Sequence, residues 1–77
     1  MNYTYDQEFC KAFGKKVREV RKSKKISMEN LALEADIEYS QIARIERGVT
    51  NPTITTVNAI AKALEVSVAS LFEFTIK

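Results

Sequence analysis

The sequence contains no histidine, no tryptophan and a single cysteine, Cys10, among its 77 residues. A lone cysteine excludes a disulfide bond within the chain, and we expect a reducing, cytoplasmic location. The usual zinc ligand sets and histidine-based acid–base catalysis both require residues that are absent. With two glycines, the chain also lacks a glycine-rich phosphate loop. We therefore expect neither an enzyme nor a bound cofactor or metal.

Long apolar runs are absent as well. No stretch approaches the roughly 18 apolar residues that a membrane-spanning helix needs. The segment MNYTYDQEF has neither the basic nor the apolar part of a signal peptide. A hydrophobic content of 45% in so short a chain suits one small domain over residues 1–77. We expect no membrane association, and nothing in the sequence indicates a small-molecule ligand.

Charge is unevenly distributed, although the net charge is only +2. Residues 11–25 contain eight basic side chains and one acidic one, whereas residues 26–51 contain two basic and five acidic side chains. A basic run of this kind is usually a solvated helix face, and only its end, at Lys25, is placed to approach a polyanion. The positive field is therefore local.

Apolar residues recur at helical spacing in five segments, most of them introduced by a capping residue. Thr4 opens a capping box before the first segment, and Ser27, Thr53 and Ser67 are good N-caps for later ones. The predicted helices cover residues 5–24, 28–35, 39–47, 54–64 and 68–73. The expected buried stripe of the fourth helix consists of Ile54, Val57, Ile60, Ala61 and Leu64. Because the alternation typical of strands is confined to the last residues, we expect an all-α domain of five helices.

The second and third of these helices are short and joined by a tight corner. Asp36 tolerates the left-handed conformation that such a corner needs, and Gly48 is placed for the same role after the next helix. Helices this short cannot bury enough surface to stand alone, so we expect the other three to form a platform for them. Gly14, inside the first helix, predicts a close packing contact.

Five motifs in order carry a resemblance to a known family. They are FGKKVREVR at 13–21; Ser27, Leu31–Ala32 and Ala35; Ile42 with IERG at 45–48; NPTI at 51–54; and IAKALEVS at 60–67. Together they resemble the Xre-type, lambda-repressor-like helix-turn-helix domains over residues 13–72. The resemblance implies a five-helix fold whose second helix crosses the DNA backbone and whose third lies in the major groove. It also implies a transcription regulator that binds double-stranded DNA sequence-specifically, similar to small stand-alone regulators such as restriction–modification controller proteins.

The third predicted helix carries hydrogen-bonding side chains where a helix-turn-helix protein reads bases, because arginine suits guanine and glutamine suits adenine. The expected base-reading residues are Tyr39, Ser40, Gln41 and Arg44. The expected contacts to the DNA backbone come from Lys25, Ser27, Met28, Arg47, Asn51 and Thr53. Met28 and Glu38 depart from the family pattern, and the middle of the chain is acidic. These departures leave open a second function, a protein-interaction module with a degenerate helix-turn-helix.

Arg21 and Glu46 are predicted to form a structural ion pair. Arg21 lies one turn beyond Val17 and Glu46 one turn beyond Ile42, so both sit at the edge of a buried helix face. A long charged side chain at such an edge needs a partner of opposite charge.

One recognition helix covers only a few base pairs, so we expect a homodimer on an inverted-repeat operator. The predicted dimer surface consists of the apolar residues after the last core helix: Val68, Leu71, Phe72, Phe74 and Ile76. In the alternative, Leu71 and Phe72 fold back into the core of the protomer, and only Phe74 and Ile76 stay outside.

Overall fold

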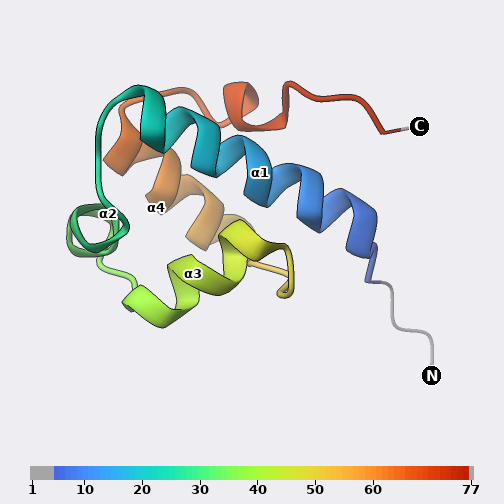
Figure 1. Ribbon diagram of the computed structural model, residues 1–77, viewed down its shortest axis with the longest axis horizontal. Helices are drawn as coiled ribbons and strands as arrows, with labels where there is room; N and C mark the ends of the chain where they lie inside the picture. Colours follow the sequence, from blue (N-terminus) through green and yellow to red (C-terminus); the bar gives the residue numbers. More distant parts are fainter. Residues whose placement is uncertain (1–4, 77) are drawn as a thin grey trace.

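The computed structural model describes residues 5–76 and contains four α-helices and one short 3-10 helix (Figure 1). The helices are α1 (Gln7–Ser23), α2 (Met28–Ala35), α3 (Tyr39–Arg47) and α4 (Ile54–Leu64), followed by η1 (Ala69–Phe72). Residues 5–76 contain no strand, so the all-α class expected from the sequence is present. No helix in this part of the chain is both long and apolar enough to cross a membrane.

Two of the predicted helix boundaries need correction. The first helix begins at Gln7 because the Asp6 carboxylate, at 3.0 Å, accepts the Phe9 N–H and acts as the N-cap. Thr4, the cap expected from the sequence, lies outside the described residues. The fifth helix, predicted over 68–73, is the four-residue 3-10 helix η1 over Ala69–Phe72. Its backbone N–H groups donate to carbonyls three residues earlier, which is the pattern of a single tight turn.

The ends of the four α-helices share one geometry. Each is followed by a residue with positive φ: Lys25, Asp36, Gly48 or Glu65. The next residue is apolar, and its N–H donates to the carbonyl five residues earlier at 3.0 to 3.1 Å. This is the Schellman arrangement, which satisfies helix carbonyls that would otherwise lack donors. Only one of the four positions is a glycine, the residue that adopts this conformation without strain.

The core gathers side chains from all four α-helices and η1. The closest packing joins α1 to α3 and η1, and α2 to α3 and α4 (Figure 1). The largest fully buried side chains of the core are Val17, Leu31, Ile42, Ile45, Ile60, Leu64 and Leu71. Ile54 was expected to continue the buried stripe of α4, and this expectation is wrong, since the side chain is 88% exposed. The physical reason is its position: Ile54 is the first residue of α4, one turn before the buried Val57.

Candidate nucleic-acid interface

The corner between α2 and α3 is built from local capping and one left-handed residue. Ser27 Oγ accepts the Asn30 N–H at 3.0 Å and starts α2, and Asp36, with φ 58° and ψ 45°, ends it. Ile37 packs against the core between the two helices, and the extended Glu38 precedes α3 without a side-chain cap. The two helices are therefore separated by only three residues. This is the geometry of a helix-turn-helix.

α3 presents a polar face to solvent because its apolar residues point the other way. Ile42 and Ile45 are 0% and 1% exposed. The opposite side carries Tyr39, Ser40, Arg44 and Arg47, all exposed, with Gln41 half-buried at its edge. All the side chains predicted to read bases therefore lie on the outward side of one helix. Hydroxyl, amide and guanidinium groups in such a row can donate to and accept from base edges in a major groove.

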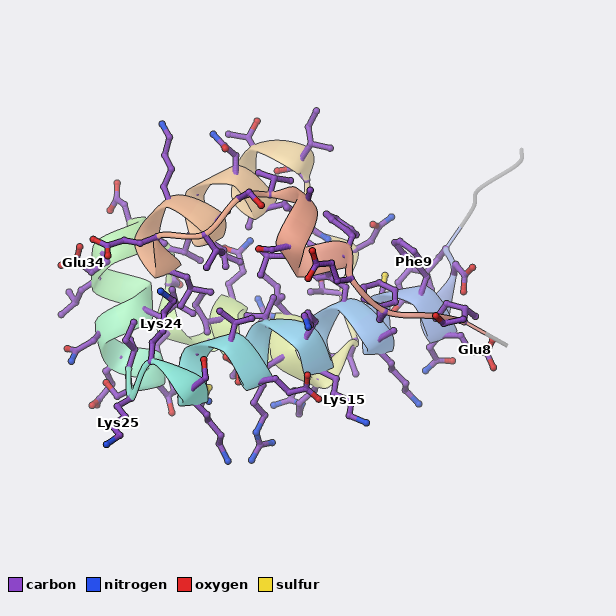
Figure 2. All side chains as sticks on the ribbon, turned by 90° about the horizontal axis from the view of Figure 1, so that it is seen from above. Glu8, Phe9, Lys15, Lys24, Lys25 and Glu34 are labelled. Carbon is purple, nitrogen blue, oxygen red and sulfur yellow. The ribbon has the colours of Figure 1, made fainter. Side chains whose placement is uncertain are left out.

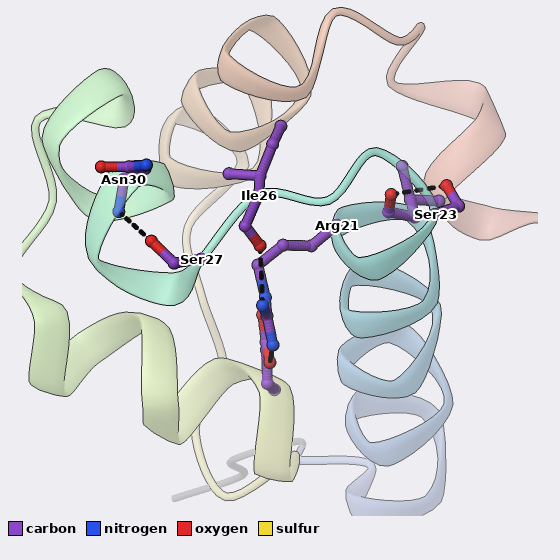
Figure 3. Close-up of polar contacts among 7 residues, drawn as sticks. Arg21, Ser23, Ile26, Ser27 and Asn30 are labelled. Atoms are coloured by element: carbon purple, nitrogen blue, oxygen red, sulfur yellow. Dashed lines mark hydrogen bonds and ion pairs between the residues drawn. The ribbon is translucent and has the colours of Figure 1, made fainter.

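The back of α3 is fixed to α1 by the ion pair expected from the sequence (Figure 3). Arg21 Nε and Nη2 donate to the two carboxylate oxygens of Glu46 at 2.7 and 3.0 Å. Arg21 Nη1 also donates to the Ile26 carbonyl at 2.9 Å. The two side chains are 10% and 5% exposed, and the hydrogen bonds that Arg21 donates to Glu46 raise the pKa of Arg21. One guanidinium thus joins α1, α3 and the turn that leads into α2, in the bidentate geometry that gives charged pairs their directionality.

Two further contacts hold α3 close to α1. A Cβ added at Gly14 would overlap the carbonyl oxygens of Ile45 and Glu46, so α1 can approach the end of α3 only with glycine there. Tyr5 donates its phenolic hydrogen to the Gly48 carbonyl at 2.9 Å, just beyond α3. These contacts therefore fix the position of α3 relative to α1 at several points.

The residues predicted to contact the DNA backbone occupy the corners beside α2 and α3. Figure 2 shows Lys25 at the turn between α1 and α2, with its side chain directed away from the molecule. The N–H groups in the first turn of α2, at Met28, have no intrahelical acceptor, as at every helix start. Asn51 and Thr53 are exposed in the segment before α4, where Thr53 Oγ1 accepts the Thr56 N–H at 3.1 Å. These groups surround the helix-turn-helix without forming one cluster.

Arg18 was not among the predicted site residues, and the structure places it beside them. A depression of about 250 Å³ is lined by Arg18, Arg21, Met28, Ala43, Glu46 and Arg47. Arg21 is occupied by Glu46, whereas Arg18 and Arg47 have no hydrogen-bond or ion-pair partner within residues 5–76. The available signal was the spacing, since Arg18 precedes Arg21 by three residues and so lies on the same side of α1.

Cys10 is the remaining side chain with reactive chemistry. It is 8% exposed, and burial, together with the nearby Asp6 carboxylate, raises the pKa of its thiol. A buried thiol with a raised pKa is a poor nucleophile. Within the described residues, no three cysteine, aspartate or glutamate side chains are grouped to hold a metal ion.

The predicted dimer residues divide between the core and the surface. Leu71 is 0% exposed, so its assignment to a dimer surface is wrong: the turn of η1 directs it into the core of the protomer. Phe72 packs against Phe9 and Phe13, with ring centroids 6.0 and 5.0 Å apart, yet remains 37% exposed. Val68 and Ile76 are 39% and 40% exposed, and Phe74 is partly buried.

The sequence model of the helix-turn-helix family HTH_3 matches residues 17–71, which contain α2, α3 and α4 in full. The chain belongs to this helix-turn-helix family. The resemblance drawn from the motifs is thereby confirmed, and the function is that of a DNA-binding transcription regulator. The control protein C.BamHI of Bacillus amyloliquefaciens is a relative of this chain. The two are 44% identical over 64 residues, which cover 82% of this chain and 79% of that protein.

Solved structures of helix-turn-helix regulators share the fold. The restriction–modification controller protein C.AhdI from Aeromonas hydrophila superposes with a TM-score of 0.81 at 32% identity, covering 82% of this chain and 96% of that one. The controller protein C.Esp1396I, solved as a tetramer with its natural 35-base-pair operator, gives a TM-score of 0.78 at 31% identity. That alignment covers 84% of this chain and 86% of that one.

Proposed function

We propose that this regulator acts as a homodimer on an inverted-repeat operator, with α3 of each protomer in the major groove. The observation that supports the proposal best is the row of exposed hydrogen-bonding side chains on α3, held from behind by the buried pair of Arg21 and Glu46. A reading helix needs such support because base contacts depend on positions accurate to a few tenths of an ångström. The cytoplasmic location stays a prediction from the sequence.

Two groups of residues have different roles in the proposal. Base contacts come from Tyr39, Ser40, Gln41 and Arg44, and Arg44 is the side chain suited to a bidentate contact with guanine. Backbone contacts come from Lys25, Arg47, Asn51, Thr53 and the N–H groups at Ser27 and Met28. Phosphate contacts set register and affinity, whereas base contacts set sequence preference.

Arg18 joins the backbone group. Its guanidinium and that of Arg47 flank one depression, and neither is paired within the described chain. Two unpaired cations a short distance apart, next to the first turn of α2, suit a phosphate of the DNA backbone.

The proposed dimer follows from the reach of one recognition helix. A single α3 covers only a few base pairs, so useful specificity requires two of them about 34 Å apart on one face of the duplex. The operator-bound assembly of C.Esp1396I is a tetramer, which supports self-association in this fold. The surface available to a second copy includes Val68, Phe72, Phe74 and Ile76.

The competing function, a protein-interaction module, rests on Met28, on Glu38 and on the acidic middle of the chain. Glu38 has no capping hydrogen bond, and its carboxylate would repel a nearby phosphate.

Selection from a random duplex library, followed by titration of the selected duplex at several salt concentrations, separates the two functions. The regulator should bind it with an affinity that falls linearly on a log–log plot against salt, by about 0.9 per phosphate contact. Failure to enrich any duplex, together with salt-independent binding, would favour the interaction module.

A further inference from the structure

Glu38 occupies the N-cap position of α3, the recognition helix of the proposed complex. Its backbone is fixed, because its carbonyl accepts the Gln41 and Ile42 N–H groups at 3.0 and 3.1 Å. Its side chain makes no capping hydrogen bond, and the carboxylate has no hydrogen-bond or ion-pair partner within residues 5–76. A side chain at this position commonly accepts an N–H group of its own helix. The Glu38 carboxylate therefore keeps its full capacity to accept hydrogen bonds from another molecule.

The direction of this side chain follows from that of its neighbour. Ile37 packs against the core, whereas Glu38 is exposed. The backbone of Glu38 is extended, with φ −65° and ψ 143°, and consecutive side chains of an extended segment point to opposite sides. Glu38 thus points away from the core at the end of α3 where a helix-turn-helix protein contacts base edges. Tyr39 and Ser40, both exposed, follow it directly.

We propose that Glu38 reads a cytosine, by accepting a hydrogen bond from its N4 amino group in the major groove. The inference rests on the proposed function and adds a base-reading residue to it. Cytosine is the base that presents a donor and no acceptor in the major groove. Adenine carries the N7 acceptor beside its N6 donor, and guanine and thymine present no donor there. Each of these three bases would place an acceptor against the carboxylate.

The negative charge of Glu38 determines how this contact affects binding. Phosphates repel the carboxylate, so it lowers the affinity for every duplex. In the groove the carboxylate also loses water, and only a donor on the base replaces the hydrogen bonds that are lost. A cytosine compensates for this loss, whereas any other base leaves the carboxylate unpaired. Glu38 therefore acts mainly by excluding the wrong bases, which is how a repulsive group contributes to specificity.

The length of α3 sets the expected position of the cytosine. Arg44 follows Glu38 by six residues, which corresponds to about 9 Å along a helix. Successive bases of one strand lie about 3.4 Å apart along the duplex axis. The cytosine should thus lie about two or three base pairs from the position that Arg44 reads. The two residues should therefore act on separate positions of the half-site.

Selection from a random duplex library, carried out in parallel with wild type, Glu38→Gln and Asp36→Asn, tests the inference. Glutamine has the shape of glutamate without its charge, and it suits adenine. Asp36→Asn is the matched control, because it removes one negative charge from the same corner and asparagine tolerates the left-handed conformation of Asp36. Both variants should bind random duplex more tightly than wild type, since each loses a charge that repels phosphates. Circular dichroism melts verify that both are folded.

The expected result is one half-site cytosine selected by wild type and by Asp36→Asn, and lost or replaced by adenine with Glu38→Gln. Replacement of that C·G pair by T·A should weaken wild-type binding by about 5- to 150-fold, the usual effect of one mismatched base pair. The same replacement should leave the binding of Glu38→Gln nearly unchanged.

An unchanged base preference in Glu38→Gln overturns the inference alone, as does an equal change in Asp36→Asn, which would assign the effect to charge at the corner. Relaxation by Glu38→Gln of the same position that Arg44→Ala relaxes would also contradict it. Failure of wild type to enrich any duplex would overturn the proposed function as well.

Discussion

The two ends of α1 are attached to the rest of the protein by different kinds of contact. Its C-terminal end is joined to α3 and to the turn before α2 by three hydrogen bonds from Arg21. Its N-terminal half contacts the C-terminal segment through phenylalanine rings, with centroids 5.0 to 6.0 Å apart. Hydrogen bonds from a planar guanidinium fix orientation, whereas ring pairs can adopt either offset-stacked or edge-on arrangements.

This difference corresponds to the two proposed surfaces. Base reading needs α3 in one orientation, and the polar end of α1 supplies it. A subunit interface needs apolar area that can adapt to a partner, and the aromatic end leaves such area exposed at Phe9 and Phe72. The predictions below test this division, beginning with the largest expected effect.

Glu46→Ala should destabilise the fold most. It leaves the Arg21 guanidinium buried without its carboxylate, and loss of one partner of a buried pair costs about 3–5 kcal/mol. This is a large part of the roughly 4–12 kcal/mol expected for a domain of 77 residues. Thermal and urea melts measure it, and a melt like that of wild type would show that the pair is dispensable.

The double variant Arg21→Met with Glu46→Leu separates stability from orientation. Apolar replacement of both partners is often neutral, so its stability should return close to that of wild type. DNA affinity should nevertheless stay reduced, because apolar packing does not fix the direction of α3. Full recovery of DNA binding would show that apolar packing orients α3 as well as the ion pair does, and the proposed difference between the two ends of α1 would not hold.

Gly14→Ala should destabilise by about 1–3 kcal/mol, as overpacking usually does, despite the better helix propensity of alanine. The added methyl group meets the backbone of α3, which cannot rotate away as a side chain would. Chemical denaturation measures the loss. Ala12→Gly, at a half-buried position of the same helix, controls for propensity.

Arg44→Ala and Arg18→Ala should weaken DNA binding in different ways. Loss of a base contact relaxes specificity by about 1–3 kcal/mol at one operator position. Loss of a phosphate contact weakens all sequences alike and lowers the slope of log affinity against log salt by about 0.9. Titrations with operator and with random duplex distinguish them, and equal losses on both duplexes for Arg44→Ala would remove it from the base-reading set.

Replacement of Cys10 should have the smallest effect on stability, and this effect should depend on pH only at high pH. The pKa of the thiol is raised in the folded state, so its contribution to stability is fully present below its usual pKa of 9.0 and is lost as pH rises through the folded value. Urea melts of wild type and Cys10→Ala should therefore converge slightly above pH 9. A constant difference between the two proteins across this range would argue against thiolate formation in the buried site.

Much of the fold was accessible from the sequence because its signals are local. Ser27 and Thr53 cap the helices that they were expected to cap, and Asp36 and Gly48 take the left-handed corners. The pairing of Arg21 with Glu46 was inferred from two separate helices, each of which placed a charge at the edge of an apolar stripe. Helical periodicity supports such inferences wherever one core determines which face of each helix is buried.

The predictions failed where contacts between elements distant in the sequence determine whether a side chain is buried. Ile54 satisfies the helical spacing of α4, but its own side chain is left uncovered and is 88% exposed. Leu71 enters the core because η1 is a 3-10 turn, a choice that depends on packing against α1 rather than on residues 68–73 alone. Arg18 acquires its place beside Arg47 only when α1 and α3 pack together.

The Schellman corners also bear on how the protein folds. At three of the four, a residue other than glycine adopts positive φ, a conformation that its own local preference disfavours. What holds the chain there is the apolar residue that follows, since Ile26, Ile37 and Val66 all pack against the core. The corner between α2 and α3 is therefore held both by the tolerance of Asp36 for positive φ and by the packing of Ile37, and only the second depends on the rest of the fold. The placement of α3 for DNA recognition thus depends on the completed core as well as on the residues of the corner itself.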